Sequence, residues 1–429
     1  MPNTDTRFLG HPRGLGLLFG VEMWERFSYY GMRALLVLYL VNGLHWSDRD
    51  AANLYGTYTG LVYGVQIIGG FLADRFLGTR RSLLIGGIII ALGHFVLAIP
   101  TGAMLYLGLG LVVAGTGLFK PNVSTMVGQL YAPGDSRRDA GFTIFYMGIN
   151  LGATFAPLVT GYLAQRVGWH WGFGAAGVGM VLGLIVYVWG RNTYLAGIGI
   201  DPPGKRATVD TDVNDTSATT RILALLLLFA FVGVFWMGYD QAGTSVNLFT
   251  DRHVDRHVGS FETPTAWYQS VQPFAVLVFA PIFAALWAML SRRDREPSTP
   301  TKMAVGLGLL ALSFVVLAMG GRVADNGSLA GPWWIVGAYV IQVLGEMCVS
   351  PVGLSYVTKV APVKYASLLM AAWFLATGVG DKFAGIVAGY ASTMTAERFF
   401  YLVGGIAGIA TVLLALIVPW LKKTTMKAA

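Results

Sequence analysis

The chain has 429 residues, of which 55% are hydrophobic and only 12% charged. Soluble domains carry about 25% charged residues, so this composition excludes an ordinary soluble protein and favours a membrane protein. The net charge of +8 does not indicate nucleic-acid binding, because most basic residues flank predicted membrane segments, and the single Cys348 excludes a disulfide within the chain.

Twelve apolar segments are long enough to cross a hydrocarbon core of about 30 Å as helices. They lie at about 13–42, 52–76, 80–99, 103–130, 139–165, 169–190, 220–249, 266–291, 302–321, 332–358, 364–393 and 398–421. The first of them is too long for the apolar region of a signal peptide, so we expect no cleaved leader.

Lysine and arginine show the predicted orientation of these segments. Most of them fall at the chain termini and in alternate loops, and few fall in the loops between. Cytoplasmic loops carry this excess, so we predict that both termini are cytoplasmic. We expect a monomeric multi-pass protein in the lipid bilayer of the plasma membrane, which in bacteria is the inner membrane.

The longest polar stretch, residues 191–219, divides the chain nearly in half. We therefore predict an N-terminal six-helix bundle at 1–190, a cytoplasmic linker at 191–219 and a C-terminal six-helix bundle at 220–429. Both halves carry charges in their first and fourth predicted helices. A duplicated transporter has this arrangement, with its site between the repeats.

The stretch VEMWERFSYYGMR at 21–33 places Glu22, Glu25, Arg26 and Arg33 in an otherwise apolar predicted helix. Each charge at the bilayer centre costs about 2.5–3.5 kcal/mol on insertion scales. Glu22 and Arg26 offset part of this cost as an i,i+4 pair in the favourable order. The charges either join helices structurally or line a wet cavity with titratable carboxylates, and their number favours the cavity.

Four further polar residues lie inside predicted helices: Lys120, Asn150, Asp240 and Glu346. The balance of acids and bases allows two ion pairs between the bundles, Arg33 with Asp240 and Lys120 with Glu346. Protonating an acid, or offering a base a substrate carboxylate, would weaken such a pair. The two pairs are therefore candidate gates, because a ligand shifts an equilibrium through differential contacts.

Several motifs resemble one family. The pattern ExxERFxYYG at Glu22–Gly31 resembles the signature of the proton-dependent oligopeptide transporters, within the major facilitator superfamily. GTGLFKPN, FYMGINLG, SPVGLSYVTKVAP and AAWFLATGVG resemble further blocks of this family, and GGFLADRFLGTRR at 69–81 resembles a loop of the superfamily. The resemblance implies an all-α membrane protein with the major facilitator superfamily fold, twelve transmembrane helices in two pseudo-symmetric six-helix bundles.

The resemblance also implies proton-coupled import of di- and tripeptides by alternating access, with the peptide in a central polar cavity and no cofactor besides the protons. Residues matching those that bind peptide are Tyr29, Tyr30, Arg33, Tyr63, Lys120, Asn150, Gln272, Glu346 and Trp373. Among them, Arg33 and Lys120 are implied to hold the peptide carboxylate, and Glu346 with Asn150 the amino end. Residues implied in proton coupling, with the acids of the candidate gates, are Glu22, Glu25, Arg26, Asp240 and Glu346.

Three positions depart from the family pattern. Asp240 is a glutamate in many relatives, so the acid is kept with a shorter reach. Gln272 stands where asparagine is expected, which puts its contact with the peptide amino end in doubt. Asp381 also replaces an expected asparagine, and we interpret it with Lys382 as a structural pair between helices.

Other function classes have weaker support. GIDPPGKR at 199–206 lacks the final Ser or Thr of a phosphate-binding loop, and DRHVDRHV at 251–258 offers two histidines in an exposed outer loop without a third metal ligand. We therefore expect neither an enzyme nor a metal site. The main alternative is a transporter of another small substrate on the same scaffold, such as nitrate or a peptide-like metabolite.

Overall fold

The computed structural model describes residues 8–132, 134–200, 218–362 and 365–425, and almost all regular structure in these ranges is helical. The chain divides into two compact units. Unit 1 contains Met1–Tyr39 and Leu61–Arg206, and unit 2 contains Leu40–Gly60 and Ala207–Ala429. The predicted linker lies largely at 201–217, outside the described residues.

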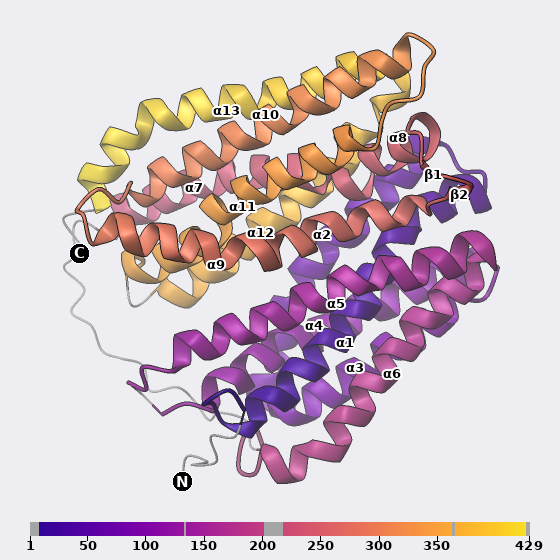
Figure 1. The fold of residues 1–429 in the computed structure, drawn as a ribbon. Helices are drawn as coiled ribbons and strands as arrows, with labels where there is room; N and C mark the ends of the chain where they lie inside the picture. The colour runs from indigo at the N-terminus through magenta and orange to yellow at the C-terminus, as the bar shows by residue number, and fades with distance from the viewer. Residues whose placement is uncertain (1–7, 133, 201–217, 363–364, 426–429) are drawn as a thin grey trace. The chain divides into compact units, whose positions relative to one another are not determined.

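Unit 1 is an antiparallel assembly of long helices. They are α1 (Arg13–Leu38), the second half of α2 (Asp48–Leu72) with its π-helical end (Ala73–Leu77), α3 (Thr79–Leu97), α4 (Gly102–Gln129), α5 (Arg138–Arg166) and α6 (Trp169–Tyr194). Helix α1 packs against α5 and α6, and α3 packs against α4 and α6 (Figure 1). Leucine, phenylalanine and methionine side chains from these helices form its core.

Unit 2 has the same helical character with more breaks. Its elements after residue 217 are α7 (Ala218–Tyr239), η3 (Asp240–Gly243), α8 (Ser245–His253), β1 (His257–Val258), β2 (Phe261–Glu262), η4 (Thr265–Ser270), α9 (Val271–Ser291), α10 (Thr299–Asp325), α11 (Trp333–Val360), α12 (Ala366–Ala388), η6 (Ala391–Thr393) and α13 (Ala396–Thr425). Helix α10 lies beside α13 and α11, and α12 packs on α7 (Figure 1).

Residues 40–60 belong by sequence to the predicted N-terminal bundle but pack within unit 2. The reason is a contact between glycines. A Cβ built on Gly56 would lie 2.9 Å from the Cα of Gly385 on α12, and one built on Gly60 would lie 2.8 Å from the carbonyl oxygen of Gly378. Small residues at this spacing let the backbones of α2 and α12 approach closely.

Each of the twelve predicted segments overlaps a helix, and ten described helices are long and apolar enough to cross a membrane by length and composition. Helix α1 is not among the ten, and it carries Glu22, Glu25 and Arg26 in its middle. Helix α12, with Asp381 and Lys382, is not among them either. The two exceptions thus carry charges that the sequence analysis singled out.

The prediction of an exposed loop at 251–258 is wrong in its first part. Residues 251–253 complete helix α8, and a two-residue hairpin of β1 with β2 follows. His253 packs its ring on Phe249, whereas the Nδ1 of His257 lies 3.0 Å from the carboxylate of Asp255. The two histidines therefore lie on different elements and do not form the i,i+4 pair that one continuous helix would give.

Glycine also sets the distance between α1 and α5 in unit 1. A Cβ at Gly152 would collide with the backbone oxygen of Met23, whereas a Cβ at Gly174 on α6 would meet nothing within 4 Å. Close approach of these two backbones therefore depends on the missing side chain at Gly152.

Gly152→Ala should consequently lower the free energy of unfolding by about 1–3 kcal/mol, the usual cost of overpacking a tight interface. Gly174→Ala is the matched control, since it makes the same change in helix propensity without a clash. Thermal unfolding of both purified variants in detergent measures the difference. Equal melting temperatures would contradict this account of the α1–α5 contact.

Candidate functional site

Helix α1 buries three charged side chains in unit 1. Glu22 and Glu25 are 0% exposed and Arg26 is 5% exposed. The guanidinium of Arg26 lies between the two carboxylates. Its Nε is 3.4 Å from Glu22 Oε1, as the i,i+4 spacing predicts, and its Nε and Nη2 both donate to Glu25. One base therefore compensates two acids within a single turn of helix.

Lys120 on α4 supplies the second positive charge. Its Nζ donates to Glu22 Oε1 at 2.7 Å, and its side chain is 23% exposed. The sequence analysis did not pair these two residues, because 98 positions separate them and helical spacing says nothing about contacts between helices. A balance of two acids and two bases in one bundle is the signal that could have indicated the contact.

We call Glu22, Glu25, Arg26 and Lys120 the α1–α4 charge network. With both carboxylates ionised it carries no net charge. In a medium of low dielectric constant, charges are tolerated when they are paired and hydrogen-bonded, and both acids meet this condition. The second oxygen of Glu22, Oε2, is buried and has no hydrogen-bond partner in the described part of the chain.

Aromatic rings continue along the same helix. Tyr29 and Tyr30 contact each other edge to face, with ring centroids 5.3 Å apart. The guanidinium of Arg26 lies 4.9 Å from the ring centroid of Tyr29, and that of Arg33 lies 5.6 Å from that of Tyr30. Cation–π contacts of this kind place the predicted peptide-binding arginine beside a predicted lining tyrosine.

The remaining predicted residues of unit 1 lie on other helices. Tyr63 is half-buried on α2. Asn150 is buried on α5, and its side-chain nitrogen donates to the carbonyl oxygen of Tyr146, one turn earlier in the helix. This bond uses the amide nitrogen of Asn150 and leaves its side-chain oxygen, Oδ1, outside the contact.

Unit 2 buries the predicted acids Asp240 and Glu346, at 2% and 7% exposure. Asp240 opens η3, directly after α7 ends at Tyr239. The hydroxyl of Tyr239 donates to Glu346 Oε2 on α11 at 2.6 Å. Tyr239 was missed in the sequence analysis, although its place beside an intramembrane acid could have drawn attention to it.

Two other predicted residues of unit 2 are held by neighbours. The side-chain nitrogen of Gln272 on α9 donates to Gln342 Oε1 on α11 at 2.9 Å. Trp373 on α12 is 3% exposed and packs edge to face on Phe229, with centroids 5.7 Å apart. Lys382 Nζ donates to Thr57 Oγ1 at 2.7 Å and so joins α12 to α2.

The candidate gates Arg33–Asp240 and Lys120–Glu346 stay predictions.

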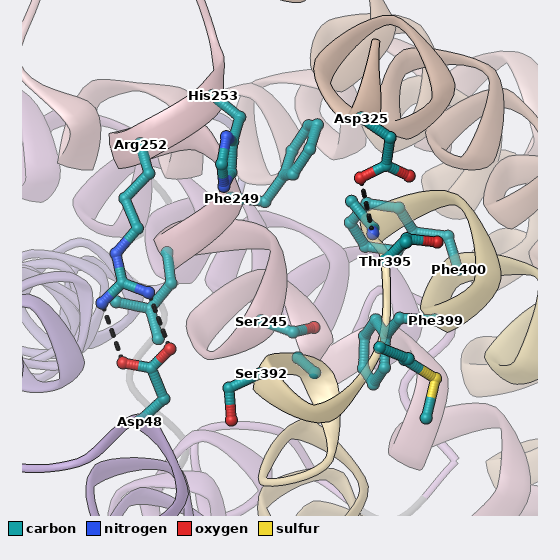
Figure 2. Close-up of a pocket in the computed structure, with 14 residues that line it drawn as sticks. Asp48, Ser245, Phe249, Arg252, His253, Asp325, Ser392, Thr395, Phe399 and Phe400 are labelled. Carbon is teal, nitrogen blue, oxygen red and sulfur yellow. Dashed lines mark hydrogen bonds and ion pairs between the residues drawn. The ribbon is translucent and has the colours of Figure 1, made fainter. Parts of the chain in front are cut away.

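A second polar feature lies at the end of unit 2 where α8 meets α13, and the sequence analysis did not predict it. A cavity of about 230 Å³ lies there, and Figure 2 shows the residues that line it. Arg252 binds both carboxylate oxygens of Asp48 at 2.7 and 2.8 Å, and Asp325 accepts hydrogen bonds from the backbone at the start of α13. These charges are used in structural contacts, so the cavity offers less to a zwitterion than the α1–α4 charge network does.

Within the described ranges, no three His, Cys, Asp or Glu side chains gather closely enough to hold a metal ion. The chemistry available at the buried site is that of carboxylates, ammonium and guanidinium groups, with aromatic rings and amides beside them. Such a set can exchange protons and bind charged groups of a small polar molecule.

Long apolar helices that bury ion pairs indicate a multi-pass membrane protein, and comparisons with known proteins identify its family as one of transporters. The model of the POT family matches residues 80–201 and 195–403, and the chain belongs to this family. It is 39% identical to the uncharacterized transporter YclF of Bacillus subtilis, with 97% of this chain and 95% of that protein covered.

Two further relatives carry more specific names. The chain is 34% identical to a di-/tripeptide transporter of Lactococcus lactis subsp. cremoris, over 99% of this chain and 98% of that one. A crystal structure of a peptide transporter POT in complex with sulfate matches with a TM-score of 0.91 at 36% identity, covering 99% of this chain and 98% of that chain. The chain therefore has the fold of the major facilitator superfamily.

The α1–α4 charge network predicts an order of stability effects. Arg26→Met leaves two buried carboxylates with one base, Lys120, which contacts only Glu22, and should cost about 3–5 kcal/mol in unfolding free energy. Lys120→Met should cost less, because Arg26 still compensates both acids and Lys120 is partly exposed. Melting temperatures of the purified variants in detergent give the order.

A second substitution provides the control for this prediction. Combining Arg26→Met with Glu25→Gln removes one charge of each sign and should recover part of the lost stability. If the double variant were no more stable than Arg26→Met alone, the coupling between these two side chains would not be the cause of the loss.

Proposed function

We propose that this protein is a symporter that imports di- and tripeptides together with protons by alternating access. The observation that carries the proposal is the α1–α4 charge network, in a chain that matches a di-/tripeptide transporter over nearly its whole length. A peptide of variable side chain is recognised by its charged termini, which need fixed opposite charges and a tolerant, aromatic-lined cavity. The relatives' names favour peptides over nitrate.

The Glu22–Lys120 contact suggests how proton and peptide are linked. While Glu22 is ionised, the ammonium group of Lys120 is engaged at 2.7 Å. A proton on Glu22 removes the carboxylate charge and weakens this ion pair. Lys120 is then available for the carboxylate of a peptide, so proton binding favours peptide binding, and by linkage peptide binding favours the proton.

Arg26 has a supporting role in this proposal. Its contact with both acids keeps Glu25 compensated whichever state Glu22 is in. Asp240 and Glu346 are proposed to work in the same cycle through the candidate gates, and Tyr239 orients Glu346 by its hydrogen bond. We also propose that the protein is a monomer with both termini in the cytoplasm, and that it needs no cofactor besides the coupling protons.

Glu22→Gln should abolish uphill accumulation of a dipeptide driven by a proton gradient while sparing counterflow exchange. The amide keeps the size of the side chain but cannot take up and release the coupling proton. Uptake of a radiolabelled dipeptide into proteoliposomes, with and without a pH gradient, measures both activities. Glu397→Gln on α13, outside the network, is the matched control. Retained uphill uptake by Glu22→Gln would refute the coupling role.

Lys120→Ala should weaken transport of peptides with a free C-terminal carboxylate by about tenfold or more, since a charged hydrogen bond contributes about 1.5–3 kcal/mol. C-terminal amides should be affected much less. Competition by matched dipeptide acids and amides, in exchange assays on the same variant, gives the ratio. Lys120→Arg keeps the charge and should retain part of the preference. Equal losses for acids and amides would remove the carboxylate assignment.

A further inference from the structure

One end of unit 1 holds a cationic cavity that the transport proposal does not use. Helix α3 begins there and α6 ends there, and the two helices pack against each other. The cavity has a volume of about 220 Å³, and its lining residues are Arg80, Arg81, Arg191, Asn192 and Ile200. Three arginines and an asparagine thus line a small volume.

The local fold holds Arg80 and Arg191 in place. The backbone nitrogen of Arg80 donates to the carbonyl oxygen of Gly199 at 3.0 Å, and its guanidinium donates to the carbonyl oxygen of Arg191. The hydroxyl of Tyr187 donates to the carbonyl oxygen of Arg80 at 3.1 Å, and the guanidinium of Arg191 lies 5.9 Å from the centroid of the same tyrosine ring. Two of the three arginines are therefore positioned before any ligand arrives, which lowers the cost of ordering them on binding.

The described residues place no carboxylate against the positive charge at this cavity. Within the described residues, none of the three arginines forms an ion pair with a carboxylate. The Nε of Arg80 is also buried and without an acceptor among these residues. A planar fork of donors with no carboxylate partner is suited to bidentate binding of a phosphate group.

An apolar stripe continues from the cavity along α3. Ile85 and Ile88 follow Arg81 by four and seven residues, so they share its face of the helix. Their side chains are 38% and 45% exposed. In a membrane-spanning helix, exposed isoleucines on one face contact lipid chains.

Helix α6 carries a second exposed apolar stripe, which leads along the helix toward the cavity. Ile185 and Val188 precede Asn192 by seven and four residues and are 57% and 47% exposed. Trp189 is 72% exposed and precedes Asn192 by three residues, about one turn of the helix. Tryptophan at this level is typical of the boundary between lipid headgroups and hydrocarbon.

We propose that this cavity binds the phosphate of an anionic phospholipid, whose acyl chains lie along the exposed stripes of α3 and α6. The ligand chemistry is a phosphate ester held by Arg80, Arg81 and Arg191. A soluble phosphate offers the same anion but gains nothing from the isoleucines, so the stripes favour the lipid. Basic pockets beside membrane helices are known to suit such headgroups.

Native mass spectrometry of the delipidated full-length protein tests this proposal. Long-chain phosphatidylglycerol should bind as a discrete adduct, and phosphatidylcholine of the same chain length should bind more weakly. Arg81→Gln should reduce the apparent affinity for phosphatidylglycerol about fivefold, and Arg81→Gln with Arg191→Gln further still. Glycerol 3-phosphate, which carries the anion without acyl chains, should neither bind detectably nor displace the lipid at equal concentration.

The matched control is Arg292→Gln with Arg293→Gln, which removes two exposed arginines that follow α9 and leaves the cavity intact. It should bind phosphatidylglycerol like the unmodified protein. If the double variant at the cavity does not fold, Arg81→Gln alone decides, because this exposed side chain contacts no other described residue by hydrogen bond or ion pair. Equal binding by Arg81→Gln and the unmodified protein would overturn the site, and binding of glycerol 3-phosphate as tight as that of the lipid would overturn the lipid assignment.

Discussion

The α1–α4 charge network is the constraint on which the transport site depends. Four ionised groups inside apolar helices would cost roughly 10 kcal/mol on insertion scales if each remained uncompensated. Arg26 meets this cost by contacting Glu22 and Glu25 at once, and Lys120 brings the sum of charges to zero. The same contacts leave a balance that one proton on Glu22 can change. The same four side chains therefore account for the tolerance of burial and for the proton response that we propose.

The fold was largely predictable because helices that cross a membrane need long apolar segments, and these segments can be recognised in the sequence. Every predicted segment overlaps a helix, since a stretch of about 20 apolar residues has few other structures available in lipid. The breaks were not predictable in the same way. Residues 40–60 pack in unit 2 through Gly56 and Gly385, and a contact between two glycines far apart in sequence has no local signature. Likewise the end of α8 was predicted as a loop, because the last turn of this helix is as polar as a loop.

At the candidate site, spacing predicted contacts within a helix and missed those between helices. The Glu22–Arg26 pair is confirmed because an i,i+4 relation is fixed by helix geometry. The contact of Lys120 with Glu22 needs α1 and α4 to pack in one register, which the sequence does not state. Side-chain partners also altered two expectations. Gln272 donates a hydrogen bond to Gln342, and Glu346 accepts one from Tyr239. Both side chains that are predicted to contact the peptide are therefore already hydrogen-bonded to other residues of the protein.

Neutrality of the α1–α4 charge network has an electrical consequence. With Glu22 and Glu25 ionised, the four side chains sum to zero, and one bound proton raises this sum to one positive charge. A zwitterionic cargo adds nothing to it. In the proposed cycle, the loaded network thus differs from the empty one by a full elementary charge, and moving that charge across a potential of 100 mV is worth about 2.3 kcal/mol. A membrane potential that is negative inside would therefore favour the inward movement of the protonated, loaded network in this proposed cycle.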